Sequence, residues 1–190
     1  MSLLVLGLVL FLGMHSASIV APGWRAAQIE RRGEQTWKGG YSLVSLLGFV
    51  LLIYGYVLAR QAPIPVYSPP DALRYLALLL MLPVFPLFFA TYLPGRIKHT
   101  AQHPTLLATM VWAISHLLTN GTLADVLLFG AFLVWAVADL RSVKHRAVSG
   151  KAFGTPPSTF NDLIALVGGL VVYGVFLFWA HGWLIGVSPL

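Results

Sequence analysis

The stretch SLLVLGLVLFLGMHSASIVA, residues 2–21, decides the fold class of this chain. It holds no Asp, Glu, Lys or Arg, and it is as long as the helix of roughly 20 apolar residues that crosses a bilayer. No Lys or Arg precedes Arg25, so the stretch lacks the positive segment that opens a secretory signal peptide, and we expect the helix to be retained. The sequence thus predicts a membrane-spanning helix that carries one histidine, His15, among apolar residues.

The composition extends this conclusion to the whole chain. Of its 190 residues, 58% are hydrophobic and 9% are charged, whereas about a quarter of the residues of a soluble domain are charged. Too few polar side chains remain to cover a surface in water, so lipid must cover it. The net charge of +6 comes from short basic clusters between apolar spans, which is typical of membrane topology, and we expect no nucleic-acid partner. The chain has no cysteine, which excludes disulfides and thiolate metal sites.

Apolar runs recur along the rest of the chain at lengths that suit membrane crossing. We predict an all-α, polytopic membrane bundle of about six transmembrane helices, in a single integral membrane domain over residues 1–190. The predicted helices are residues 2–21, 39–59, 72–92, 105–118, 123–140 and 163–183. The fourth is short for a spanning helix, at roughly 21 Å by helical rise.

The basic residues predict the orientation of these helices. All but two of the 12 Lys and Arg residues, Arg60 and Arg74, lie in the first, third and fifth connections. Cytoplasmic loops carry the excess of Lys and Arg, so these three connections are predicted to be cytoplasmic and both termini periplasmic, in a bacterial inner membrane. His99, His103 and His145 fall in the same connections, where we expect them at headgroup level or in water.

Acidic residues are few, and three of them have a structural interpretation. Each lies three positions after a Ser or Thr at the start of a predicted helix, which is the spacing of a capping box. The pairs are Ser68 and Asp71, Thr122 and Asp125, and Thr159 and Asp162. We interpret these carboxylates as helix caps rather than as catalytic groups, because a negative charge also suits the helix N-terminus.

Two histidines are predicted deep inside the hydrocarbon layer. By helical rise in a layer of about 30 Å, His15 lies roughly 10 Å and His116 roughly 16 Å above the inner boundary, so their depths agree within the error of the predicted helix ends. One interpretation is that two imidazoles on different helices bind one metal or the iron of a porphyrin. The other is that each histidine only forms a hydrogen bond with a neighbouring helix. Zinc is disfavoured, because a tetrahedral site needs more ligands and no Glu or Cys lies at that depth. We expect His181, near the outer end of the last helix, at headgroup level.

The residues around His116 favour a flat aromatic ligand. Trp112, His116 and Asn120 recur at helical spacing and share one face of the fourth predicted helix. The same spacing is typical of ordinary helix packing with one polar stripe. If the ligand is haem, its propionates need basic or polar partners on the cytoplasmic side, and the candidates are Arg25, Arg96, Lys98 and Tyr41.

Several segments together carry a resemblance to a known family. They are His103-Pro104 followed by WAISHLLTNG (residues 112–121), LLFGAFLVWAVAD (residues 127–139), His15-Ser16, and GEQTWKGGYSLVSLLGFVLLIYGY (residues 33–56). Over most of its length the chain resembles the NnrU family, which is associated with bacterial denitrification gene clusters. That family is related to 15-cis-zeta-carotene isomerase, a membrane enzyme that carries haem b and isomerises a central cis double bond of a polyene.

The resemblance implies a ligand set for this chain. In the isomerase, the histidines of an "HSG"-type element and of a "W-x-x-x-H" element ligate the haem, and these positions match His15 and His116. The isomerase also has a cysteine, implicated in ligand switching, where this chain has Ala113. The sequence therefore predicts a redox-linked haem b protein with bis-histidine ligation. Two functions fit it, isomerisation of a small apolar polyene and a denitrification-associated role that involves nitric oxide. The alternative is a haem-free membrane scaffold or assembly partner with structural histidines.

Overall fold

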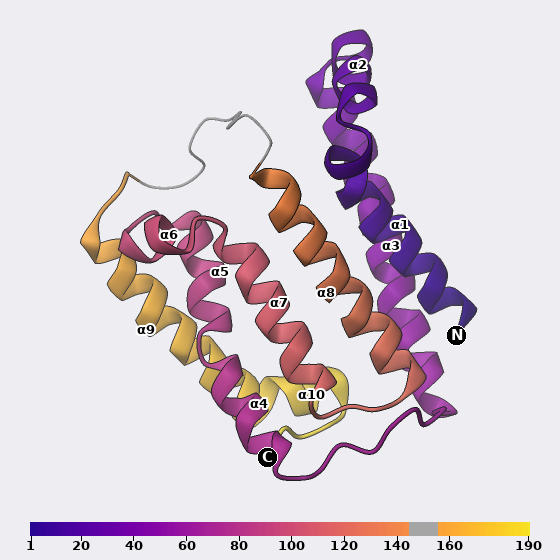
Figure 1. Ribbon diagram of the computed structural model, residues 1–190, viewed down its shortest axis with the longest axis vertical. Helices are drawn as coiled ribbons and strands as arrows, with labels where there is room; N and C mark the ends of the chain where they lie inside the picture. The colour runs from indigo at the N-terminus through magenta and orange to yellow at the C-terminus, as the bar shows by residue number, and fades with distance from the viewer. Residues whose placement is uncertain (145–155) are drawn as a thin grey trace. The chain divides into compact units, whose positions relative to one another are not determined.

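The computed structural model describes residues 1–144 and 156–190, and within these ranges most of the chain is helical (Figure 1). His145, Arg146 and Lys151, which the sequence places in the fifth connection, lie outside the described residues. The helices are α1 (Ser2–Val20), α2 (Pro22–Arg32), α3 (Glu34–Gln61), α4 (Leu73–Met81), α5 (Val84–Tyr92), α6 (Arg96–Ala101), α7 (Pro104–Leu117), α8 (Leu123–Val143), α9 (Thr159–Val175), the π-helical turn η1 (Phe176–Ala180) and α10 (His181–Ile185). In the described part of the chain, β pairing is limited to one isolated bridge between Pro65 and Thr122.

The predicted all-α membrane fold is confirmed. Five helical segments of the described chain are long and apolar enough to cross a membrane, and α7 is a sixth, shorter apolar helix. The long segments are Ser2–Val20, Glu34–Gln61, Leu73–Tyr92, Leu123–Val143 and Thr159–Ile185. The second and last of them begin several residues before the sequence-based bounds, because polar residues extend helices beyond their apolar core.

Two short helices were not expected from the sequence. Pro22 starts α2 directly after Ala21, where the backbone leaves the helical region, and a proline is well tolerated at the first helical position because it lacks only an N–H that would be unsatisfied. Helix α6 precedes α7 and ends at Ala101, and the capping residue Gln102 has a φ of +58°. Both lie in connections that the sequence predicts to be cytoplasmic.

The helices group into two compact units. Unit 1 comprises Met1–Ser68 and Gly121–Ser142, and thus α1, α2, α3 and most of α8. Unit 2 comprises Pro69–Asn120 and Val143–Leu190, with α4 to α7 and the last membrane segment. That the whole chain forms a single membrane domain remains a prediction.

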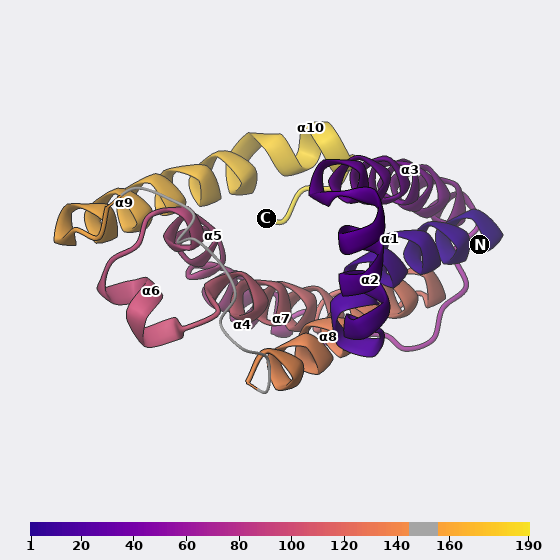
Figure 2. The same cartoon turned by 90° about the horizontal axis from the view of Figure 1, so that it is seen from above.

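In unit 1, α1 and α3 approach each other so closely that glycine is required at the contact (Figure 2). A Cβ on Gly7 would overlap the backbone of Leu52, and a Cβ on Gly55 would overlap the backbone of Leu4. A Cβ on Gly48 would lie 2.6 Å from the Phe11 nitrogen. Small residues of this kind drive helix association in lipid, because lipid tails provide no hydrophobic force between helices and close van der Waals contact replaces it.

The loop that follows α3 in unit 1 is attached to the start of α8. The carbonyl of Gly121 accepts hydrogen bonds from the Val66 and Tyr67 nitrogens, at 2.8 and 3.1 Å. The predicted capping box at Thr122 is confirmed, because Asp125 Oδ2 accepts from both the Thr122 nitrogen (2.9 Å) and its hydroxyl (2.6 Å). Tyr56 donates to the other carboxylate oxygen at 2.6 Å, so a buried carboxylate links α3 to α8.

Unit 2 is built on α5, which packs against α7 and α9. A Cβ on Gly169 of α9 would overlap the backbone of Pro86 in α5, so this helix pair also meets at a glycine. The predicted role of Asp162 in capping its own helix is wrong. Ser158 caps α9 by accepting from the Phe160 nitrogen, and Asp162 instead accepts from the Arg96 and Ile97 nitrogens at the start of α6. The side chain of Asp71 does not cap α4, whose N-cap is Ala72.

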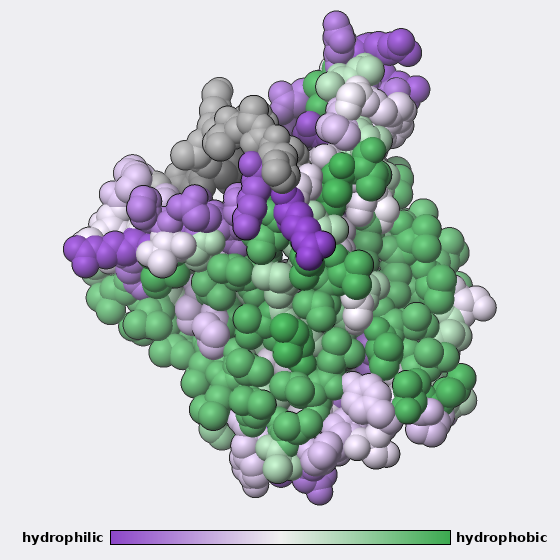
Figure 3. All heavy atoms as spheres, in the orientation of Figure 1, coloured by the Kyte–Doolittle hydropathy of each residue, from purple (hydrophilic) through white to green (hydrophobic). Residues whose placement is uncertain are grey.

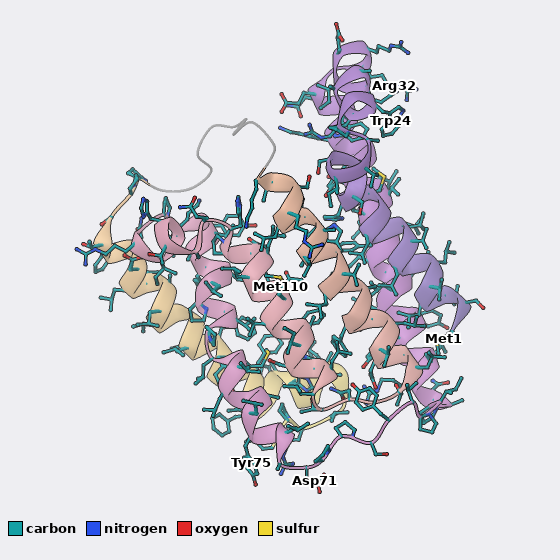
Figure 4. All side chains as sticks on the ribbon, viewed as in Figure 1. Met1, Trp24, Arg32, Asp71, Tyr75 and Met110 are labelled. Carbon is teal, nitrogen blue, oxygen red and sulfur yellow. The ribbon has the colours of Figure 1, made fainter. Side chains whose placement is uncertain are left out.

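The surface of the membrane segments is apolar. On the face shown in Figure 3, hydrophobic residues cover the long helices of each unit, and polar residues gather over α2 and around α6. Trp24 and Arg32 lie on α2 at one end of unit 1, and Met1 lies toward the other end (Figure 4). Leucine, isoleucine and valine side chains that are half or more exposed are acceptable only in contact with lipid, so the protein is a membrane protein.

The α1–α3 contact predicts a difference between two glycine-to-alanine variants of α3. Gly55→Ala should lower the unfolding free energy by about 1–3 kcal/mol, because its methyl group overlaps the backbone of Leu4. Gly40→Ala, in the same helix, meets nothing within 4 Å and should be neutral or stabilising by up to about 1 kcal/mol. Thermal unfolding in detergent, followed by circular dichroism, measures both. Equal Tm values for the two variants would contradict the contact.

Candidate functional site

His15 is held in one orientation by its own helix. Its Nδ1 lies 2.7 Å from the carbonyl oxygen of Phe11, one turn earlier in α1. A carbonyl only accepts, so Nδ1 carries the proton and Nε2 carries the lone pair. Metal-binding histidines use this arrangement, in which the second nitrogen fixes the tautomer and the direction of the ring.

Aromatic side chains from three helices surround the His15 ring. The ring centroids of Phe11, Tyr41 and Trp135 lie 4.3, 5.3 and 5.9 Å from that of His15, and Trp135 meets it edge-on. Phe11 belongs to α1, Tyr41 to α3 and Trp135 to α8, so all are in unit 1. His15 is half-buried among them. The result is an apolar, aromatic wall beside an imidazole.

The indole N–H of Trp135, in this aromatic wall, is an unpaired hydrogen-bond donor. Its Nε1 is buried and has no hydrogen-bond partner among the described residues. Buried polar groups almost always have a partner, so an orphan donor in a functional region suggests an absent acceptor. Trp135 is not among the site residues predicted from the sequence. Its spacing of three residues from Phe132 was a signal of an aromatic helix face, and Phe132 also contacts Phe11.

A shallow apolar groove of about 500 Å³ runs between α1 and α8 next to this wall. It is lined by Leu12, Ser16, Ile19, Val20, Val126, Leu127, Gly130, Ala131, Val134, Trp135 and Ala138. Its volume lies within the range of small-molecule sites, which are also mostly apolar. Unit 1 thus has room for an apolar molecule one residue away from His15.

His116 is held in the same way as His15. Its Nδ1 lies 2.8 Å from the carbonyl oxygen of Trp112, one turn earlier in α7, and the Trp112 ring lies 5.2 Å from the imidazole. Asn120 donates from Nδ2 to the backbone carbonyl of His116 at 2.9 Å. The structure therefore brings together the three residues that the sequence placed on one helix face.

A third imidazole lies close to His116 in unit 2. The centroid of the His181 ring is 6.4 Å from that of His116, and the ring planes are inclined by 28°. His181 is not among the site residues predicted from the sequence, because its distance along the last helix suggested headgroup level. Only the fold of unit 2 reveals the pair.

The predicted propionate partners lie in different places. Arg25 is exposed on α2 of unit 1, and Arg96 is exposed at the start of α6 in unit 2. Tyr41 is half-buried and lies against the His15 ring in unit 1. The structure joins Tyr41 to His15, and the roles of Arg25 and Arg96 stay predictions.

The described residues fit a ligand that needs few protein donors. Residues 1–144 and 156–190 contain no group of three or more His, Cys, Asp or Glu that could hold a metal ion. A haem, which the sequence resemblance implies, needs only one or two axial nitrogens and an apolar surround. His15 in unit 1 and His116 in unit 2 each provide one oriented imidazole nitrogen, and the buried Trp135 N–H beside His15 has no hydrogen-bond partner among the described residues.

The orphan donor predicts that Trp135→Phe acts on ligand binding and leaves the fold intact. The variant removes an unsatisfied N–H and keeps an aromatic ring, so the stability of the haem-free protein should change by less than about 1 kcal/mol. If the ligand is haem, as the sequence resemblance implies, the loaded variant should release it to an acceptor protein about 3- to 10-fold faster, which corresponds to one lost hydrogen bond. Phe132→Leu, in the same helix, is the control for lost aromatic packing. Identical release rates for Trp135→Phe and wild type would contradict a role of the indole.

Comparison with known proteins identifies the family. The chain matches the family model described as NnrU protein over residues 3–189, nearly its whole length. No curated protein and no solved structure matches it. The match covers both units, including the segments that hold His15 and His116. The chain belongs to the NnrU family.

Proposed function

We propose that this protein binds haem b in the membrane, with His15 and His116 as its axial ligands. The observation that carries the proposal is the shared geometry of the two side chains. Each has Nδ1 on the carbonyl of the residue one turn earlier, each is half-buried, and each lies beside a tryptophan. Two intramembrane histidines prepared in the same way are expected of ligands, since an ionisable group in the hydrocarbon layer is costly without a function.

Haem fits this chain better than a bare metal ion does. A zinc or copper site needs three or four protein ligands, and the described residues provide no cluster of that size. A porphyrin provides four nitrogens itself and needs apolar and aromatic contacts for its faces. Phe11, Trp135 and Trp112 provide such contacts beside the two histidines.

The protein residues in this proposal bind, orient and exclude water. Phe11 and Trp112 fix the two imidazoles through their carbonyls, and the aromatic wall covers part of the His15 ring. When bound, haem supplies one-electron redox chemistry and, if an axial position opens, a Lewis-acidic iron. Two axial histidines favour redox-linked function over a permanently open oxygen site.

The groove beside Trp135 indicates what kind of substrate the protein takes. The groove beside Trp135 is apolar and open along α1 and α8, which suits a small apolar molecule that arrives from the lipid. Cis–trans isomerisation of a polyene is one use of such a groove. A denitrification-associated role that involves nitric oxide is the other, and both use the same haem.

The proposed location is the bacterial inner membrane, with the basic helix α2 in the cytoplasm and both termini in the periplasm. The support is the asymmetry of Lys and Arg between the connections. Arg31 and Arg32 end α2, and Arg96 and Lys98 lie in α6.

The ligand assignment predicts the absorption spectrum of histidine variants. Wild-type protein expressed with sufficient haem should show a Soret band and a low-spin ferric spectrum, since two axial nitrogens saturate the iron. His116→Ala should lose haem or become high-spin. His15→Ala should change the spectrum, the redox potential or the rate of haem loss. His99→Ala, an exposed histidine of α6, is the matched control and should resemble wild type. Absence of a Soret band in the wild type would end the proposal.

The competing function is a haem-free scaffold or assembly partner. The same Nδ1–carbonyl hydrogen bonds favour it, because a purely structural histidine in a helix satisfies its donor in this way. It differs from the haem proposal in one expectation. The double variant His15→Gln/His116→Gln should keep full function as a scaffold and lose it as a haem protein. Complementation of a strain that lacks the protein measures this difference.

The proposed orientation is testable by thiol labelling, because the natural chain has no cysteine that could react. Gly23→Cys places a thiol on α2, where nothing lies within 4 Å of the new Cβ, and Ser188→Cys places one near the C-terminus. In intact spheroplasts, a membrane-impermeant maleimide should label only Ser188→Cys, and it should label Gly23→Cys after permeabilisation. The reverse pattern would contradict the orientation.

A further inference from the structure

The groove between α1 and α8 in unit 1 contains a glycine that the packing of the described chain does not require. Gly130 of α8 lines this groove, and a Cβ at its position would meet nothing within 4 Å in the described chain. Gly7, Gly48 and Gly55 differ, because a Cβ on each would overlap the backbone of the facing helix. Glycine is also among the least favourable residues in a helix interior. At Gly130 it leaves the floor of the groove open to a molecule outside the chain.

The groove is uncharged and has two hydrogen-bonding side chains. Among the described residues that line it, none is Lys, Arg, Asp, Glu or His, and only Ser16 and Trp135 carry a side-chain nitrogen or oxygen. A charged group is costly in such a surround without a partner, so the occupant is neutral. Pockets that bind anionic lipid headgroups have basic residues, which this lining lacks. The lining therefore favours a neutral apolar molecule over a phospholipid.

The indole of Trp135 needs a hydrogen-bond acceptor. Its Nε1 is buried and has no partner in the part of the chain that the structure describes. An indole nitrogen only donates, and a hydrocarbon chain has no atom that accepts. A neutral oxygen, such as that of a carbonyl group, satisfies the donor. Because Trp135 lines the groove, a small rotation of its side chain brings the N–H to a molecule seated there.

The donor lies toward one end of the groove, which gives the occupant a direction. Trp135 precedes Asp139, the next charged residue of α8, by one helical turn, or roughly 6 Å. Val126, the first lining residue of α8, lies roughly 13 Å from Trp135 by helical rise. A carbonyl group bonded to Trp135 thus lies near the polar end of α8, and an apolar tail can extend past Gly130 toward Val126. A carbonyl-bearing ring with a hydrocarbon tail has this shape.

A helix of a second copy fits the groove less well than a small molecule does. The groove has a volume of about 500 Å³, which lies within the range of small-molecule sites. An α-helix with its side chains is about 10 Å across, so a stretch as long as the α8 lining occupies roughly 1,400 Å³. The backbone carbonyls of a helix interior are also already bonded, so they leave the Trp135 donor without an acceptor.

We propose that the groove between α1 and α8 binds a lipid-soluble quinone, whose carbonyl oxygen accepts a hydrogen bond from Trp135 Nε1. The Ser16 hydroxyl, on the facing helix, is the second donor of the lining. A quinone is neutral, carries carbonyl oxygens on a flat ring and has a hydrocarbon tail, so it matches each feature of the groove. The inference rests on the proposed function only for the use of this groove and not for bound haem, since all lining residues belong to unit 1. It concerns binding, and no electron or proton is transferred.

The first test measures equilibrium binding of a tritiated benzoquinone with a decyl tail to the full chain in detergent, by scintillation proximity. Gly130→Leu fills the floor of the groove and should weaken binding by about 10-fold or more. Gly174→Leu in α9 is the matched control, since a Cβ there also meets nothing within 4 Å in the described chain, and it should bind like wild type. Both variants replace an open helix glycine, so neither should lower stability.

A pair of ligands separates the hydrogen bond from apolar packing. Decylbenzene has the same tail and no oxygen, and it competes with the labelled quinone for the groove. Wild type should prefer the quinone, and Trp135→Phe should reduce this preference about 3- to 10-fold, which corresponds to one lost hydrogen bond. Ser16→Ala should reduce the preference in the same direction. Phe132→Leu changes an aromatic ring of α8 outside the lining and should leave the preference unchanged.

Four results overturn the inference. One is equal binding of the quinone to Gly130→Leu and wild type. Another is equal competition by quinone and decylbenzene in wild type, which is expected if any acyl chain or hydrocarbon polyene fills the groove. The third is a wild-type dimer that Gly130→Leu converts to a monomer, which assigns the groove to a second copy. The fourth is a Trp135→Phe protein that releases haem faster and keeps its preference for the quinone, because the single indole N–H then serves haem.

Soret absorption of the same samples keeps this inference separate from the proposed function. Quinone binding that depends on Gly130 and Trp135, in a protein without haem, supports the inference and contradicts the proposed haem binding. A protein with haem and without quinone binding supports the proposed function and overturns the inference.

Discussion

Close backbone contact at glycines is the constraint on which unit 1 depends. Lipid gives helices no hydrophobic reason to associate, so α1 and α3 must gain van der Waals contact over their length. Gly48 makes this possible next to Phe11, and the carbonyl of the same Phe11 holds Nδ1 of His15. The helix contact and the imidazole orientation therefore share one residue. A change in the packing of α1 on α3 would also change the direction of Nε2 and the distance to Tyr41.

In unit 2, as in unit 1, a close helix contact at a glycine helps to position a helix next to a histidine. Gly169 lets α9 reach the backbone of Pro86 in α5, and α5 also packs on α7, which carries His116. Asp162 adds a polar connection at the other end of α9, where it accepts from two backbone nitrogens of α6. These contacts fix α9 against α5 and α6, and the π-turn after α9 affects the rotation of His181 about the helix axis. Oriented imidazoles are found in both units, and each orientation comes from a backbone carbonyl.

The sequence was sufficient for the features that depend on hydropathy and depth. Apolar length predicted the spans, and depth singled out His15 and His116 before any resemblance was considered. The capping box at Asp125 was also predictable, because its partner is three residues away. Features that depend on contacts between distant segments were not. Asp162 interacts with α6 rather than with its own helix, and Trp135 reaches His15 from another helix. His181, which follows a π-turn, lies beside His116 of α7. No local pattern encodes these three contacts.

The membrane segments differ in length, and this difference makes the tilt of the longest one depend on the thickness of the bilayer. Thr159–Ile185 has 27 residues, or about 40 Å at helical rise, whereas Ser2–Val20 has 19 and measures about 28 Å. A hydrocarbon layer of about 30 Å matches the shorter segment, so the longer one has to tilt or emerge. The stacked indoles of Trp179 and Trp183 are the kind of side chain that settles at the headgroup boundary. Bilayer thickness therefore acts directly on the inclination of the helix that ends beside His116.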